Sequence, residues 1–456
     1  MPVLPIDTGR YGTSEMRGIF DEENRLQKLL DVEAALAWAH GKTGNIPLKD
    51  ADKIVEKASI KYVKLDRVNA IESEIRHDIM SVVRALSEVC GSSGAYIHLG
   101  ATSSDILDTA TALQLKEAVD LIGEKLDDLE QALLKGVHAH KTTIMMGRTH
   151  GQHALPITFG LKLAVWMRET SRHIQRLQDC RKRLLVGKMT GAVGTQAGLG
   201  PHAIKIQELV MERLQLKAVE VSTQIVQRDR FAELICLLSV IASTLDKVAI
   251  EIRELQRPEI REVSEFFERK KQVGSSTMPH KHDPQTCETV CGLAKIMRSL
   301  VIPALENIPT WHERDMTQSS AERFLIPEAC ILIDHMLASM INVLENLRVD
   351  RERMRKNLDL TQGRMMSEAV MLALTQKGVD RQQAHELVRK LAMRSYFDKA
   401  PFRQALLEDK VVSGRLSEAE INEALNPTNY LGTALTQIDQ AIIVTCQERA
   451  ARGLSD

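Results

Sequence analysis

The sequence predicts an all-α protein built from three helical domains, the central one a bundle of long helices. Two observations lead to this fold class: apolar residues recur at three- and four-residue steps over long stretches, and alternating strand patterns bounded by hairpin turns of useful length are lacking. Aromatic residues make up only 4% of the 456 residues, so the core must consist of aliphatic side chains and Met, which suits helix-on-helix packing. A chain of this length exceeds one compact core.

The domain boundaries follow from where the long helices are expected to begin and end. Residues 1–108 are expected to form shorter helices, and residues 109–350 the central bundle. Residues 351–456 contain short helical stretches that glycine and proline interrupt, which predicts a separate small C-terminal domain.

Four stretches predict the long helices of the bundle. The first should begin after Asp105 and Asp108, either of which can cap it, and has an apolar seam at heptad spacing formed by Leu115, Val119, Ile122, Leu126, Leu129, Leu133 and Val137. Another has the seam Leu234, Leu238, Ile241, Leu245, Val248, Ile252 and Leu255, and two more cover about 157–185 and 327–347. Several of these helices are apolar around much of their circumference. One chain cannot bury that much surface, so we expect a homo-oligomer.

The charge and cysteine content exclude several classes of protein. The chain carries 60 basic and 61 acidic residues, a balance that does not indicate nucleic-acid binding. The seven cysteines are odd in number and scattered, which argues against a disulfide framework and for a cytoplasmic protein. Cys287 and Cys291 have no second ligand pair nearby, so no metal is expected. The N-terminus lacks the features of a signal peptide, and we see no apolar run of transmembrane length, so no membrane partner is expected.

One polar segment, residues 274–284, carries most of the functional information. It reads Gly-Ser-Ser-Thr-Met-Pro-His-Lys-His-Asp-Pro, and Glu288 follows it. Two prolines forbid a regular helix there, so the segment should be an exposed loop. A Gly-Ser-Ser run alone is more often a flexible linker. The lysine six residues after Ser275 and the helix-like sequence that resumes near Glu288 argue instead for a chemical role.

Four further polar segments resist a packing explanation. Residues 147–153 place His150 between two glycines in a loop that joins two long helices, and residues 76–78 (Arg76, His77, Asp78) lie on a predicted helix. Residues 96–105 end at the start of a long helix, whose first amides favour an anion, and residues 311–323 offer Arg314 and Arg323. Each has an ordinary alternative, namely a surface histidine, an exposed ion pair, a helix cap and surface salt bridges. Together they indicate a ligand site.

Residues 274–283 resemble the signature loop of the fumarase/aspartase superfamily, G-S-S-x-M-P-x-K-x-N. Within it, the polar segments above, together with Arg10, Tyr11 and residues 222–230, resemble the adenylosuccinate lyase family in order and spacing, most clearly over residues 10–345. The resemblance implies a small-molecule nucleotide substrate, a homotetramer whose sites are each shared between three subunits, and no metal or organic cofactor. It implies elimination of fumarate from adenylosuccinate to give AMP, and from the succinylated aminoimidazole carboxamide ribotide of purine synthesis.

The resemblance also implies roles for individual residues. Ser275, or its neighbour Ser276, would be the base and His150 the general acid, with Lys281 stabilising the base, Glu288 orienting His150, and His77 assisting near the leaving group. The succinyl carboxylates would be held by Thr102, Ser103, Gln224 and Lys281. The nucleotide and its phosphate would be held by Arg10, Tyr11, Arg314, Ser319 and Arg323. Four further residues complete the expected substrate-binding set: Arg76, Asp78, His98 and Asp283.

Asp283 departs from the family pattern, which has asparagine there. An ionised aspartate only accepts hydrogen bonds and would repel a substrate carboxylate. Three outcomes are open: Asp283 is protonated or paired with His282 or another cation, the site takes a different succinyl amine, or the chain is a weakly active tetrameric paralogue. The alternative functions are therefore another lyase of the superfamily and an inactive relative.

Overall fold

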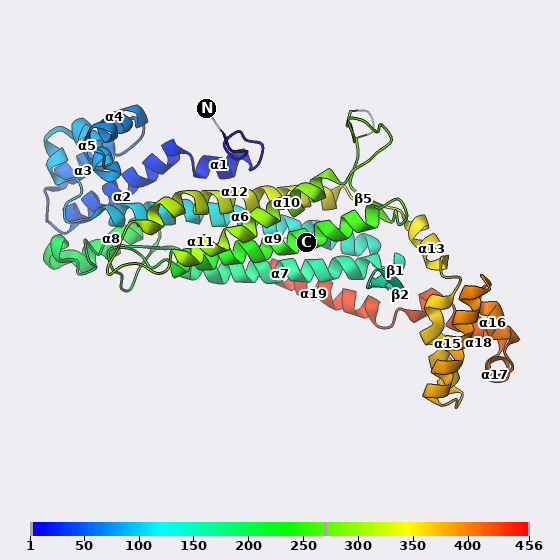
Figure 1. Cartoon of the computed structure of the whole chain (residues 1–456). Helices are drawn as coiled ribbons and strands as arrows, with labels where there is room; N and C mark the ends of the chain where they lie inside the picture. The colour runs from blue at the N-terminus through cyan, green and yellow to red at the C-terminus, as the bar shows by residue number, and fades with distance from the viewer. Residues whose placement is uncertain (1–2, 269–270, 455–456) are drawn as a thin grey trace. The chain divides into compact units, whose positions relative to one another are not determined.

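The computed structural model describes residues 3–268 and 271–454 and shows a predominantly helical protein (Figure 1), which confirms the predicted fold class. In chain order the helices are α1 Ser14–Ile19, α2 Glu22–Lys42, α3 Leu48–Lys57, α4 Leu65–Ile75, α5 Asp78–Cys90, α6 Ser103–His140, α7 Phe159–Leu184, α8 Ala203–Leu214, α9 Asp229–Gln256, α10 Gln285–Ser299, α11 Val301–Glu306, α12 Thr317–Glu345, α13 Arg351–Asp359, α14 Ser367–Gln376, α15 Arg381–Phe397, α16 Phe402–Glu408, α17 Lys410–Ser413, α18 Glu418–Ala424 and α19 Ala434–Ala451. The short 3₁₀ helices are η1 Gly91–Tyr96, η2 Ala197–His202, η3 Arg364–Met366 and η4 Pro427–Tyr430.

The long helices lie close to where the apolar seams predict them. All seven seam residues of α6 and all seven of α9 are buried. The start of α6 differs from the expectation, since the helix begins at Ser103 rather than after Asp105 or Asp108. Asp105 still caps it, but from inside the first turn, because its Oδ2 accepts a hydrogen bond of 2.8 Å from the backbone N–H of Thr102.

The last long helix, α12, begins ten residues before the predicted start at Pro327, which lies inside it. Proline lacks the N–H that would bond four residues back, so the carbonyl of Arg323 loses its usual intrahelical donor there. Contrary to our expectation, α12 is long and apolar enough to cross a membrane by composition. However, 61% of its most apolar window is buried inside the protein, as in a core helix.

A two-stranded antiparallel hairpin interrupts the helices, which the sequence did not predict. Strand β1 covers Ile144–Thr149 and β2 covers Gln152–Thr158, so residues 147–153 are not a simple loop between helices. Thr149 pairs with Gln152, which leaves His150 and Gly151 as the two turn residues, with φ of +53° and +72°. Two positive φ values are typical of the type I′ turn, whose twist matches that of the strands. The other strand pairs are two residues long: β3 Val186–Gly187 with β4 Lys217–Ala218, and β5 Val263–Ser264 with β6 Arg348–Val349.

The chain divides into two compact units, each assembled from three separate stretches. The first unit comprises the chain up to Asp127, His173–Leu245 and Gly292–Ala338. The second comprises Asp128–Arg172, Asp246–Cys291 and the chain from Ser339 onward. The helices α6, α7, α9, α10 and α12 each contribute residues to both units. The division into three domains at residues 108 and 350 stays a prediction.

Each unit has a core of its own. In the first, α3, α4, α5 and α8 each pack against α2 (Figure 1), and α5 also packs against α3 and α4. Together they bury a large aliphatic cluster that includes Leu30, Leu36 and Leu86. In the second, α14, α15, α16 and α18 enclose a smaller cluster around Phe402 and Leu406. The polar segments of interest lie at the ends of these helices and in the loops between them.

Candidate active site

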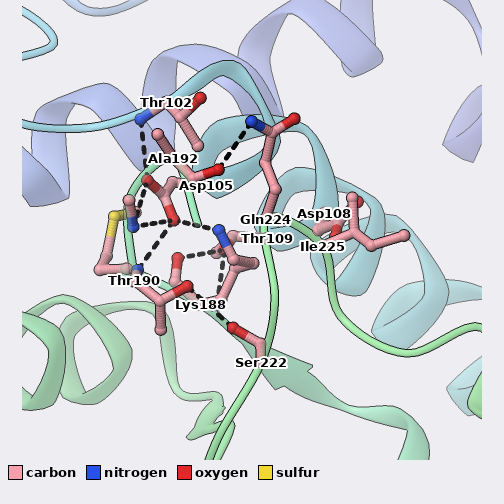
Figure 2. A network of polar contacts seen from close by, with 12 residues as sticks. Thr102, Asp105, Asp108, Thr109, Lys188, Thr190, Ala192, Ser222, Gln224 and Ile225 are labelled. Carbon is pink, nitrogen blue, oxygen red and sulfur yellow. Dashed lines mark hydrogen bonds and ion pairs between the residues drawn. The ribbon is translucent and has the colours of Figure 1, made fainter. Parts of the chain in front are cut away.

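The N-terminus of α6, where Thr102 and Ser103 lie, is held by a buried ion pair in the first unit (Figure 2). Asp105 and Lys188 are both fully buried and directly paired. Asp105 also accepts backbone N–H bonds from Thr190, at 2.9 Å, and from Gly191, at 3.2 Å. Because burying an unpaired charge is costly, this convergence fixes the loop after Lys188 against the start of α6.

The same network reaches Gln224 and Arg314. Gln224 donates through Nε2 to the carbonyl of Ala192 at 2.8 Å, and its Oε1 accepts from Nη1 of Arg314 at 3.0 Å. Figure 2 shows Gln224 beside the loop that Asp105 holds. The hydroxyl groups of Thr190 and Ser222 lie 2.8 Å apart in this network. Hydroxyls, an amide and a guanidinium near the first amides of a helix form a set of donors suited to a carboxylate.

Residues 76–78 form the junction between two helices, which corrects the expectation that they lie on one. Arg76 ends α4 in a left-handed conformation, with φ of +53°, and His77 is the N-cap of α5, accepting at Nδ1 from the N–H of Met80 at 3.3 Å. Asp78, the first residue of α5, accepts from Nη2 of Arg323 at 3.2 Å. The junction therefore brings Asp78 and Arg323, two expected substrate-binding residues, into direct contact within the first unit.

His98 is paired with a buried carboxylate rather than free. Its Nδ1 lies 2.6 Å from Oε1 of Glu33, which is 1% exposed. Burial alone would lower the pKa of His98, but the hydrogen bond and charge of Glu33 outweigh it and raise that pKa. His98 has a φ of +62°, and Gly100 packs so closely on the Gly198 carbonyl that a Cβ there would lie 2.3 Å from its oxygen. This segment is tightly fixed.

The N-terminal pair Arg10 and Tyr11 is tethered to α12 within the first unit. The Tyr11 ring packs against His335, with ring centroids 5.2 Å apart. Two residues on, Thr13 donates from Oγ1 to Asp334 at 2.7 Å, and Asp334 is also paired with Lys125. Arg10 itself is exposed, and Ser319 lies in the first turn of α12.

In the second unit, His150 occupies the turn of the β1–β2 hairpin and is exposed to solvent. Arg148 anchors the strand before it through two bonds to the fully buried Glu262, of 2.8 and 2.7 Å. Asn357 donates to the same carboxylate at 2.7 Å. An exposed imidazole on a rigid support can meet a ligand without moving the backbone.

In the loop of residues 274–284, the hydroxyl oxygen of Ser275 accepts hydrogen bonds from two backbone N–H groups. Its Oγ accepts from the N–H of Met278 at 3.0 Å and of Thr277 at 3.3 Å. Such a bond pattern is common wherever a serine closes a turn. The same two N–H dipoles would also stabilise negative charge on this oxygen. Ser276 has a different contact, since its hydroxyl lies 3.4 Å from that of Thr277.

Asp283 is paired with Lys281 of the same loop, with 3.1 Å between Nζ and Oδ1. Of the partners considered from the sequence, His282 is engaged elsewhere: its ring stacks on Phe267 at a centroid distance of 4.1 Å. The carbonyl of His282 accepts from Gln256 at 3.0 Å. The negative charge of Asp283, which stands where the family has asparagine, is thus compensated by Lys281 inside the loop.

Glu288 lies in the first turn of α10, half-exposed, with Arg253 as its neighbour at 3.9 Å. Arg253 also donates to Sγ of Cys291 at 3.4 Å. Burial, followed by the nearby Glu265, raises the pKa of the Cys287 thiol far above its ordinary value. Cys287 is therefore a neutral core residue, and a thiolate metal ligand is not favoured there.

Several residues that support the site escaped the sequence analysis: Lys188, Thr190, Glu33, Glu262 and Asp334. Each is buried or partly buried and acts on a predicted site residue or its loop through contacts distant in sequence. A charge among apolar residues is the sign that the sequence offers at Lys188; the carboxylates and Thr190 carry no sign that separates them from surface residues. The predicted residues themselves fall into two groups, each placed within its own unit. The first unit holds Arg10, Tyr11, Arg76, His77, Asp78, His98, Thr102, Ser103, Gln224, Arg314, Ser319 and Arg323, and the second holds His150, Ser275, Lys281, Asp283 and Glu288.

Comparison with protein families covers most of the chain. A family described as lyase matches residues 9–297, and one described as adenylosuccinate lyase C-terminus matches residues 363–441. The second match lies in the part of the chain where the sequence resemblance was weakest.

Two relatives that match this chain over nearly its full length are both named adenylosuccinate lyase. The chain is 53% identical over 454 residues to adenylosuccinate lyase of Pyrococcus horikoshii, covering 100% of both chains. It is 47% identical to adenylosuccinate lyase of Methanocaldococcus jannaschii, covering 97% of this chain and 96% of the relative. Among solved structures, fumarate lyase from Mesorhizobium sp. BNC1 superposes with a TM-score of 0.89 at 31% identity, over 97% of this chain and 99% of the other. The 3-carboxy-cis,cis-muconate lactonizing enzyme from Pseudomonas putida gives a TM-score of 0.89 at 34% identity, over 98% of this chain and 100% of the other.

Proposed function

The chain belongs to the adenylosuccinate lyase family, and from this premise we propose how its residues divide the reaction. The protein is a carbon–nitrogen lyase of purine nucleotide biosynthesis that eliminates fumarate from adenylosuccinate and leaves AMP. We propose that it also cleaves the succinylated aminoimidazole carboxamide ribotide, because the same succinyl amine is broken in both substrates.

We assign the base to Ser275, and the observation that carries this proposal is the pair of N–H donors directed at its Oγ. A serine hydroxyl is a weak base in water and must be ionised by its surroundings. Backbone dipoles fixed before substrate binds stabilise an alkoxide without reorganising. The alkoxide takes the proton from the succinyl carbon next to a carboxylate, and the electron pair moves into that carboxylate.

His150 then donates the proton that the leaving nitrogen needs as the carbon–nitrogen bond breaks. Its exposed position in a rigid turn supports this role. Such a group contributes about 10²–10⁴-fold to the rate. Glu288 would orient the imidazole and His77 would assist near the leaving group.

Substrate binding is divided between two sets of donors in this proposal. Thr102, Ser103, Gln224 and Lys281 hold the succinyl carboxylates. Arg10, Tyr11, Arg314, Ser319 and Arg323 hold the nucleotide and phosphate. The network around Asp105 supports the first set, since it fixes the start of α6, with Thr102 and Ser103, against the loop that holds the Gln224 side chain. Arg76, Asp78, His98 and Asp283 complete the site.

We further propose a cytoplasmic homotetramer in which each site is completed by three subunits. Large apolar side chains that remain exposed on α7, α9, α10 and α11 support the oligomer: Val165, Val240, Ile250, Ile296 and Ile302 are 44–68% exposed. The cytoplasmic location is supported by the seven cysteines, which the described structure holds as thiols rather than in disulfides.

The direct test is an assay of the purified protein with adenylosuccinate. Absorbance should fall as the substrate is consumed, and fumarate and AMP should appear in equal amounts. Light scattering should give a mass close to four chains. Failure to form fumarate at any substrate concentration would overturn the reaction, and a monomer with full activity would overturn the shared site.

A further inference from the structure

We propose that Asp283 is an internal competitor for the substrate carboxylate: it occupies Lys281 in the unliganded enzyme and yields that ammonium when substrate binds. The proposal rests on the proposed function, in which Lys281 holds a succinyl carboxylate. A carboxylate oxygen already lies 3.1 Å from the Lys281 ammonium, where a substrate oxygen would have to lie. Asp283 thus stands in for the ligand that the site is built to take.

The backbone around this pair is fixed, so the pairing is a property of the loop. The ring of His282 stacks on Phe267, and its carbonyl accepts from Gln256, so the residue between Lys281 and Asp283 is held through both its side chain and its backbone. At the N-terminal end of the 274–284 loop, Gly274 lies against the carbonyl of Lys281. A Cβ on residue 274 would come within 1.9 Å of that oxygen. The loop therefore closes on itself, with Ser275 adjacent to the point of closure.

A second internal carboxylate removes the other obvious anion site nearby. Glu265 accepts from the N–H of Cys287 at 2.6 Å and of Thr286 at 3.2 Å, at the start of α10. The first amides of a helix are otherwise well placed for an anion. With these amides taken by Glu265, Lys281 is what the Lys and Arg content of the 274–284 loop offers to an incoming carboxylate, so its occupation by Asp283 has direct consequences for binding.

The pair is weak enough to exchange. Lys281 and Asp283 are 49% and 27% exposed, and ion pairs in such surroundings are readily opened by a competing charge. An asparagine at this position could not hold the ammonium as an ion pair and could donate to the substrate instead. Asp283 therefore weakens the binding of dicarboxylates and favours the release of fumarate after elimination.

The test compares fumarate binding by wild type and Asp283→Asn, measured by calorimetry without turnover. Asp283→Asn should bind fumarate about fivefold more tightly, equivalent to roughly 1 kcal/mol. Its KM for adenylosuccinate should fall by a similar factor, and its affinity for AMP should not change. Asp283→Ser, which also frees Lys281 but leaves a small side chain, should tighten fumarate binding in the same direction.

Asp179→Asn is the matched control, because it removes the same charge from an exposed ion pair with Lys182, 2.8 Å long, on α7. It should leave fumarate binding unchanged. Equal or weaker fumarate binding by both folded Asp283 variants would overturn the proposal, as would equal tightening by Asp179→Asn, which would point to net charge alone. A wild-type protein that binds fumarate but does not cleave adenylosuccinate would refute the proposed function while leaving the role of Asp283 to be decided by the binding data.

Discussion

Arg148 and Glu262 are joined by two parallel hydrogen bonds, from Nη1 to Oε2 at 2.8 Å and from Nη2 to Oε1 at 2.7 Å. The Glu262 side chain is fully buried, and the Arg148 side chain is 16% exposed. Arg148 lies two residues before His150 on the strand that leads into the turn. The pair therefore braces the hairpin that carries the proposed general acid.

Replacing Arg148 by lysine should damage catalysis more than binding. Lysine keeps the charge but cannot form both bonds of the planar guanidinium. A shift of about 1 Å at His150 can cost on the order of 10²-fold, so kcat should fall about 10- to 100-fold while affinity for AMP is retained. Arg67→Lys is the control, since Arg67 forms a similar two-bond pair with Glu88 on an exposed surface. Unchanged kcat in Arg148→Lys would exclude this bracing role.

His150→Ala and Ser275→Ala should each abolish elimination without loss of fold. Both side chains lie outside the apolar core, so their removal leaves packing intact. We expect kcat to fall at least about 10²-fold in each. Ser276→Ala is the matched control and should keep near wild-type turnover, because the two amide donors are directed at Ser275. Circular dichroism and light scattering would verify the fold and assembly, and the reverse result for the two serines would move the base to Ser276.

Lys188→Met should destabilise the protein strongly. It leaves Asp105 charged and fully buried without its cation, although three backbone N–H groups still contact it. Breaking such a pair costs roughly 3–5 kcal/mol. The double variant Asp105→Asn/Lys188→Met should recover part of the loss. Lys205→Met, at an exposed pair with Glu208, should have little effect on the unfolding temperature. Similar unfolding temperatures for the two lysine variants would contradict the weight given to the buried pair.

The pairing of His98 with Glu33 should make stability depend on pH above neutrality. Burial opposes the charged imidazole, but Glu33 raises the folded pKa of His98 above its unfolded value near 6.5. The contribution of the pair is therefore fully present below about pH 6.5 and is lost as pH rises through the folded pKa. Glu33→Gln should lower the unfolding temperature more at pH 6 than at pH 8.5. Glu88→Gln, at an exposed pair, should show no such trend. A constant difference across this pH range would disprove the linkage.

The sequence predicted the helical class and the long helices because burial leaves a periodic signal. The seams of α6 and α9 read directly as heptads, and every seam residue is buried. The β1–β2 hairpin left no such signal, since its turn uses His150 and Gly151 rather than a more usual pair such as Asn-Gly, and its strands do not alternate cleanly. The predicted start of α12 at residue 327 puts Pro327 in the first turn, where proline is favoured, whereas the helix begins at Thr317 and Pro327 lies inside it.

The candidate site was predictable where it consists of exposed polar loops and not where it depends on buried support. Ser275, Lys281 and His150 are recognisable in the sequence because they lie in polar segments with glycine or proline that do not fit a hydrophobic core. Glu33, Glu262 and Asp334 cannot be told from surface carboxylates in a sequence, since they contact partners 65 to 321 residues away. The pairing of Asp283 with Lys281 is local, yet the sequence left several partners open, and only the geometry selects one.

The interleaving of the two compact units constrains how the chain can fold during synthesis. The first unit requires residues up to Ala338, and the second requires stretches that begin at Asp128 and continue to the C-terminal helix. Domains generally fold as units, N-terminal first, as the ribosome releases them. Here neither unit is complete until most of the chain has been synthesised. The apolar seams of α6 and α9 therefore stay exposed to solvent until the segments that cover them have been translated. The nascent chain is therefore expected to depend on chaperone protection until late in translation, and truncation at any single point cannot yield either unit alone.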